Sequence, residues 1–183
     1  KAIQQIRKWI DMGMNPVNIS VNQSKIVFYH ENYISEIKSL LEEYNVSGSY
    51  ITLEVLESTV IEDIDMFNSI LTEVKKLGFS VSLDDFGSGY SSLNVLSKLQ
   101  IDELKIDRIF LHTKSEVDNQ RTKWILESII DIAKKSQILV VVEGVESKQD
   151  DLFIKNLGAD IGQGYFYGRP LSISAFNDLI ETK

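Results

Sequence analysis

Short apolar segments alternate with amphipathic segments along the whole chain. The apolar segments predict strands, and apolar residues spaced three or four apart predict helices between them. In the first helix, for example, Ile3, Ile6 and Ile10 lie on one face. We predict strands over residues 17–21, 50–56, 79–84, 103–107, 138–142 and 160–165, and helices over 2–12, 33–44, 64–77, 91–98, 120–134, 149–156 and 174–182.

This alternation is typical of an α/β fold with a parallel sheet, because parallel neighbours need a crossover that is usually a helix. Two architectures fit six strands. An eight-stranded β/α barrel takes about 250 residues, so a chain of 183 residues that opens on a helix would be a TIM-like (β/α) barrel with six of its eight strands. An open doubly wound sheet is the alternative and would be complete.

The polar residues favour the barrel. Every predicted strand has a polar or ionisable residue at or near the end that we assign as C-terminal, the edge where barrels build their active sites. Singly, each could cap a helix, satisfy a backbone group or extend into solvent. Their agreement indicates a shared site. In chain order these residues are Asn18, Glu57, Asp84 with Asp85, Lys105, Glu143 and Gln163.

The strongest local signal lies in residues 82–93. The adjacent carboxylates of Asp84 and Asp85 follow an apolar segment and lead into Gly87, Ser88 and Gly89. Two carboxylates at about 4 Å repel each other by on the order of 1–4 kcal/mol. A bound cation would remove that repulsion, although a strand end followed by a helix cap is the simpler alternative.

Composition narrows the function classes. A net charge of -8 and a pI near 4.8 argue against DNA or RNA as a partner, since phosphate contacts are made mainly by Lys and Arg clusters. The chain has no cysteine, which excludes disulfides and thiolate metal sites. We see no apolar run of about 18 residues and no signal peptide. We therefore expect no direct membrane insertion and a cytoplasmic location, which is compatible with the cytosolic part of a membrane-anchored sensor.

The candidate ligands all offer oxygen atoms, which favours Mg²⁺ or Mn²⁺ over zinc, whose sites usually add His or Cys. Paired cations of this kind serve phosphoryl hydrolysis, because they neutralise the phosphate and activate a water. They also allow an acidic protein to attract an anionic substrate. Lys105 could position the water or a phosphate oxygen. The expected metal ligands are Asn18, Glu57, Asp84, Asp85 and Glu143.

At these residues the chain resembles the EAL-domain phosphodiesterases that hydrolyse cyclic di-GMP, and the resemblance covers essentially all 183 residues. Its most specific part is the run from Asp84 to Leu93. The other segments that carry it are residues 17–23 (Asn-x-Ser-x-x-Gln), 53–58 (Glu-Ser), 104–107 (Leu-Lys-Ile-Asp), 142–147 (Glu-Gly-Val-Glu) and 163–170 (Gln-Gly-Tyr).

The resemblance implies roles for the individual residues. Asn18, Glu57, Asp84 and Glu143 would bind a first metal, and Asp85 a second metal and the catalytic water. Lys105 would assist that water, so that Lys105, Asp85 and Glu143 form the catalytic group. Residues near the substrate or in the adjoining loop would be Gln163, Gly87, Ser88, Gly89 and Glu146. The loop of residues 87–92 would also contribute to a homodimer.

The chain also departs from the family pattern. The Glu-Ala-Leu tripeptide is absent, and in relatives it lies on a strand ahead of the first residue here. We therefore expect residues 1–183 to be the C-terminal three-quarters of an EAL domain and inactive alone, behind an upstream sensor or GGDEF domain. Leu56 replaces a frequent Thr, and Gly168-Arg169 a frequent Ser-Lys.

Three functions remain open for the intact domain. The preferred one is hydrolysis of cyclic di-GMP to linear pGpG with Mg²⁺ or Mn²⁺. The second is a non-catalytic cyclic di-GMP receptor, although receptors usually lose carboxylates that persist here. The third is a regulatory interaction domain that binds no nucleotide.

Overall fold

The computed structural model of the chain describes residues 1–60, 63–88, 93–111 and 116–181. In this part of the chain one parallel sheet contains six strands in the order in which they occur in the sequence. A doubly wound sheet reverses its strand order at a switch point, and this order has none. The strands are β1 (Ile19–Gln23), β2 (Ile51–Leu56), β3 (Ser80–Phe86), β4 (Glu103–Ile106), β5 (Leu139–Glu143) and β6 (Ile161–Gln163).

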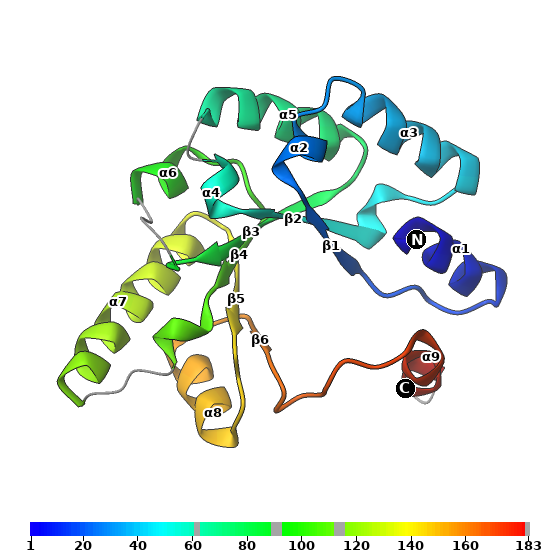
Figure 1. The fold of residues 1–183 in the computed structure, drawn as a ribbon. Coiled ribbons are helices and arrows are strands. Elements are labelled where there is room, and N and C mark those ends of the chain that lie inside the picture. The colour runs from blue at the N-terminus through cyan, green and yellow to red at the C-terminus, as the bar shows by residue number, and fades with distance from the viewer. Residues whose placement is uncertain (61–62, 89–92, 112–115, 182–183) are drawn as a thin grey trace.

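The sheet curls into a partial TIM-like barrel, with the helices on its outer side (Figure 1). This confirms the predicted fold class. The four-residue helices α2 and α4 were not predicted. In the described residues the helices are α1 (Ala2–Asp11), α2 (Lys25–Phe28), α3 (Tyr33–Tyr44), α4 (Glu57–Val60), α5 (Ile64–Lys76), α6 (Leu93–Lys98), α7 (Glu116–Lys135), α8 (Lys148–Leu157) and α9 (Ile173–Glu181), with 3₁₀ turns at Gly48–Tyr50 and Arg108–Phe110.

The hydrophobic core lies between the sheet and its covering helices. Val55, Leu83 and Leu104 of the central strands are fully buried, as are Phe67 of α5 and Leu126 of α7. Asp63 caps α5, because its side chain accepts a hydrogen bond from the backbone N–H of Met66 at 2.9 Å. These contacts give the strand ends a rigid frame.

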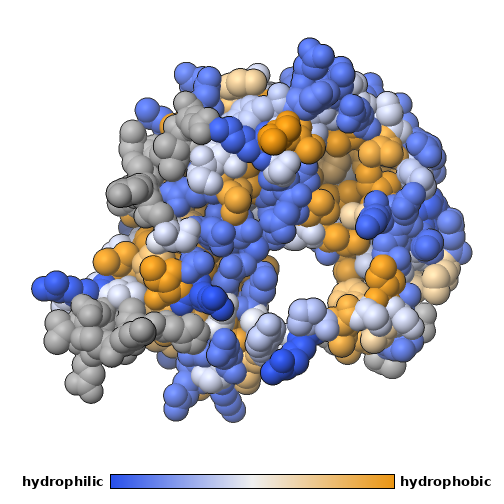
Figure 2. All heavy atoms as spheres, in the orientation of Figure 1, coloured by the Kyte–Doolittle hydropathy of each residue, from blue (hydrophilic) through white to orange (hydrophobic). Residues whose placement is uncertain are grey.

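The ring of elements closes through helices instead of through strand pairing. After β6 the chain crosses to α9, which packs against α1 (Figure 1). The Trp9 indole N–H donates to Asn177 Oδ1 at 2.7 Å, and the Trp9 and Phe176 ring centroids are 6.1 Å apart. The space-filling view shows an opening through the molecule, with hydrophilic residues along much of its border (Figure 2). None of the helices in the described part of the chain combines the length and apolar character that crossing a bilayer requires.

Candidate metal centre and pocket

A buried lysine joins three carboxylates from neighbouring strands. Lys105 of β4 is only 5% exposed, and its Nζ lies 3.0 Å from Glu54 Oε1, 2.9 Å from Asp84 Oδ1 and 2.7 Å from Glu143 Oε1. These partners come from β2, β3 and β5. Adjacent parallel strands therefore deliver four charged side chains to one place inside the sheet.

Asp84 and Asp85 both reach this place because β3 bulges there. The register with β4 passes from Leu83–Leu104 to Phe86–Ile106, so two residues stand opposite Lys105 alone. Adjacent side chains of a regular strand point to opposite faces, and a bulge changes that direction. Asp85 has a φ of +57°, and its N–H donates to Asp84 Oδ1 at 3.1 Å. A non-glycine residue in this conformation costs about 1–3 kcal/mol, which is consistent with a functional constraint.

Three carboxylates at the bulge form a group that could hold a cation. One oxygen each from Asp84, Asp85 and Glu143 lies within 4.8 Å of the others. Burial, followed by the negative charge of Asp84, raises the pKa of Asp85. Burial also raises the pKa of Glu143. Both shifts mean that the surroundings disfavour this concentration of negative charge, which a divalent cation would relieve.

Lys105 relieves part of that charge itself. Burial disfavours its charged form, but hydrogen bonds to Glu143, Asp84 and Glu54 outweigh burial and raise the pKa of Lys105. The side chain is therefore an ammonium at neutral pH and serves as a hydrogen-bond donor to all three carboxylates.

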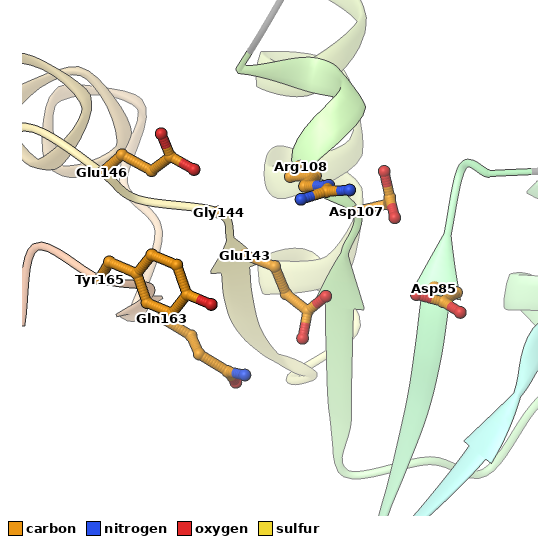
Figure 3. Close-up of a pocket in the computed structure, with 8 residues that line it drawn as sticks. All are labelled: Asp85, Asp107, Arg108, Glu143, Gly144, Glu146, Gln163 and Tyr165. Atoms are coloured by element: carbon orange, nitrogen blue, oxygen red, sulfur yellow. The ribbon is translucent and has the colours of Figure 1, made fainter. Parts of the chain in front are cut away.

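A pocket of about 390 Å³ opens beside the carboxylates. Figure 3 shows Glu143 projecting between Gln163 and Tyr165 on one side and Asp85 on the other. Arg108 brings a positive charge to this pocket. Gly144 has a φ of +74°, and a Cβ there would collide with the Arg108 side chain, so glycine is required at this position. The lining residues are Asp85, Asp107, Arg108, Glu143, Gly144, Glu146, Gln163 and Tyr165.

Comparison with known proteins identifies the family. The family model described as the EAL domain matches residues 1–170. The chain belongs to the EAL domain family.

Similar proteins include two that are named as cyclic di-GMP phosphodiesterases. This EAL domain is 35% identical to the bifunctional diguanylate cyclase/cyclic di-GMP phosphodiesterase MucR of Pseudomonas aeruginosa, over 93% of the chain and 25% of MucR. It is 32% identical to the cyclic di-GMP phosphodiesterase PdeR of Escherichia coli K12, over 96% of the chain and 26% of PdeR. The chain thus spans about a quarter of the length of these curated relatives.

A solved structure supports the fold assignment. The structure described as the PaMucR phosphodiesterase in complex with c-di-GMP superposes with a TM-score of 0.85 at 34% identity, covering 96% of this chain and 70% of that one.

The EAL domain brings several of the predicted site residues together. Asp84, Asp85, Lys105 and Glu143 form the charged cluster, and Gln163 and Glu146 line the adjoining pocket. These placements agree with the predicted convergence of strand ends, and the residues' catalytic and binding roles stay predictions.

The predicted loop begins directly after the bulge. The N–H and hydroxyl of Ser88 donate to the carbonyl of Asp85 at 3.1 and 2.8 Å. Gly87 has a φ of +98°, and a Cβ there would collide with the Phe110 ring. Gly89 lies outside the described residues.

The prediction for Asn18 was wrong. The first strand begins at Ile19, two residues later than predicted, so Asn18 stands before the N-terminal end of β1, away from the charged cluster. Its side chain donates to the carbonyl of Ser49 at 3.3 Å and accepts from Thr52 Oγ1 at 2.9 Å. Asn18 therefore ties β1 to the start of β2.

Asn22 is a better candidate on β1. It stands beside Glu54 in the β1–β2 register, so the two side chains share one face of the sheet. Residues 18–20 and 22–24 both read Asn-x-Ser. The second copy was the signal that could have pointed to Asn22.

The role of Glu57 as the ligand from the second strand stays a prediction. Glu57 begins α4 and is buried, whereas the carboxylate from β2 that contacts Lys105 is Glu54, three residues earlier. Sequence reasoning missed Glu54 because it lies inside an apolar segment instead of at its end. It also missed Asp107, which follows β4 and lines the pocket.

Proposed function

We propose that the intact EAL domain hydrolyses cyclic di-GMP to linear pGpG with Mg²⁺ or Mn²⁺. The main support is one observation: Asp84, Asp85 and Glu143 can share a cation immediately beside a pocket large enough for part of a nucleotide. The relatives named as phosphodiesterases supply the substrate class.

The donor set fits the proposed metals. Its members are carboxylates, with the amide of Asn22 on the same sheet face, and hard divalent cations prefer such oxygen ligands. Bound cations would neutralise phosphate charge and lower the pKa of a water. The residues that we propose to hold two such ions are Asn22, Glu54, Asp84, Asp85, Glu143 and Asp107.

The surrounding side chains suit hydrolysis of a phosphodiester. Water forms a new P–O bond and the P–O3′ bond breaks, so the water loses a proton and the 3′ oxygen gains one. Asp85 faces the pocket with a raised pKa, which suits a carboxylate that accepts the proton of the water. The Lys105 ammonium can stabilise charge on a phosphate oxygen, and Arg108, which lines the pocket, can bind phosphate.

We also propose that residues 87–92 contribute to a homodimer in the parent protein, and that sensor or GGDEF domains adjoin the EAL domain there. For residues 1–183 alone we expect little or no turnover, since in the described chain β1 and β6 are not paired with each other and the sheet stays open.

The test is hydrolysis by the purified parent protein. Cyclic di-GMP is incubated with Mn²⁺ or Mg²⁺, and pGpG is quantified by chromatography, with residues 1–183 assayed in parallel. Appearance of pGpG with either metal supports the proposal. Tight cyclic di-GMP binding without product would establish a receptor instead, and absence of both binding and product would leave an interaction domain.

A further inference from the structure

Lys105 and the proposed cation compete for the same oxygens. Asp84 and Glu143 belong to the carboxylate group that could hold a metal, and the same two side chains bind Lys105 Nζ at 2.9 and 2.7 Å. The metal ion and the Lys105 ammonium would each neutralise the negative charge of Asp84 and Glu143. A divalent ion and the ammonium repel each other at such separations, strongly so in a partly buried site.

The third contact of Lys105 is also with a proposed metal ligand. Glu54, which we also propose as a metal ligand, lies 3.0 Å from Nζ. The lysine side chain has a flexible four-carbon stem, so its head group can move while its backbone stays in β4. The ammonium can thus move away from these oxygens without a change in its strand.

We propose that Lys105 is a resident counter-cation that a divalent metal must displace from Asp84 and Glu143. Its presence lowers the affinity of the site for metal and keeps the metal-free cluster folded. This inference rests on the proposed function, because it concerns the metal site of the proposed hydrolase. A lysine that merely supported the metal ligands would raise the metal affinity of the site, whereas Lys105 in this proposal lowers it.

Metal binding without substrate tests the inference. Mn²⁺ is titrated calorimetrically into the purified parent protein and its variants. Lys105→Met, which keeps an unbranched side chain one atom shorter and removes its charge, should bind Mn²⁺ at least about tenfold more tightly than the unchanged chain. Lys105→Arg keeps the charge and should remain within about threefold.

Lys75→Met is the matched control. Lys75 Nζ also contacts a carboxylate, Asp102 Oδ1 at 2.8 Å, but Asp102 precedes β4 and lies away from the cluster. Its Mn²⁺ affinity should equal that of the unchanged chain. Weaker Mn²⁺ binding by Lys105→Met, or equal binding, would overturn the proposal.

The outcomes separate this inference from the proposed function. If only Lys105→Met binds Mn²⁺, the inference holds and a metal-dependent function of the natural site fails. If the unchanged chain binds Mn²⁺ but Lys105→Met binds it less well, only the inference fails. If neither binds, both fail.

A second measurement needs no variant to fold. The Nζ signals of ¹⁵N-labelled lysine are followed by NMR in the unchanged chain during Mg²⁺ titration, with Lys75 as internal reference. The Lys105 signal should shift and saturate with metal, and the Lys75 signal should stay in place. A Lys105 signal that does not respond to bound Mg²⁺ would contradict displacement.

Discussion

The two ends of the sheet both carry acidic side chains, but they neutralise them differently. At the N-terminal end, Asp102 Oδ2 accepts the N–H of Val81 and Asp160 Oδ2 accepts the N–H of Val140, each at 2.8 Å. At the C-terminal end, Glu54, Asp84 and Glu143 share the ammonium of Lys105.

The difference separates acidic residues whose partners are fixed parts of the fold from acidic residues whose partners can be replaced by another cation. The backbone N–H groups of β3 and β5 are fixed in place, so Asp160, and Asp102 besides its ion pair with Lys75, each keep a fixed partner and join consecutive elements of the sheet. The ammonium of Lys105 belongs to a flexible side chain, and another cation can take its place. Acidic residues at a sheet edge thus indicate a binding site only where their partners can be replaced.

The largest expected difference between the ends concerns stability without metal. Lys105→Met leaves three largely buried carboxylates without their cation, and we expect it to lower the free energy of unfolding by about 3–5 kcal/mol. Lys75→Met at the other end removes a half-exposed ion pair and should cost at most about 1 kcal/mol. Urea unfolding with a chelator present measures both. Equal losses would show that the two lysines have the same structural role.

The next difference concerns catalysis by the parent protein. Asp84→Asn should reduce kcat/KM for cyclic di-GMP by at least about 100-fold, since changes even behind metal ligands cost 10–100-fold. Asp102→Asn makes the same substitution at the opposite end of the sheet. The kcat/KM of this variant, when folded, should stay within about twofold of that of the unchanged protein. Production of pGpG at saturating Mn²⁺ measures both. Retained activity in Asp84→Asn would remove that residue from the proposed site.

Much of the fold could be predicted from the sequence, because buried strands and amphipathic helices carry regular patterns. The first and last residues of β1 could not be predicted in this way. Apolar residues at 17, 19 and 21 are compatible with a strand over 17–21 and with one over 19–23. Only the pairing of Ile19 with Ile51 decides between these two strands. The assignment of Asn18 failed for that reason.

The interior of the site was harder to predict than its edge. Glu54 lies within an apolar run, where its charge is stabilised only because Lys105, from a strand some fifty residues later, lies opposite. The bulge at Asp84 and Asp85 was also hidden, because Asp85 adopts a positive φ that sequence patterns associate with glycine. Contacts between distant strands decide both features.

The smallest expected difference is a pH dependence of opposite sign for two kinds of carboxylate. Burial raises the pKa of Glu143, so the folded state holds its proton more firmly than the unfolded state does. Its contribution to stability is present at low pH and is lost as the pH rises through the raised pKa. Without metal, the unchanged chain should therefore gain stability relative to Glu143→Gln as the pH falls from neutrality toward the ordinary range of a glutamate.

Asp151 of α8 gives the contrasting case. Hydrogen bonds from Tyr167 and Lys155 lower the pKa of its carboxyl, so its contribution is present above the ordinary range of an aspartate and is lost as the pH falls through the lowered pKa. The unchanged chain should thus lose stability relative to Asp151→Asn under acid. Chemical unfolding of all three proteins across the pH range measures both differences. If the two had the same sign, a carboxylate outside the cluster would not differ from one within it, and the distinction between the two kinds would fail.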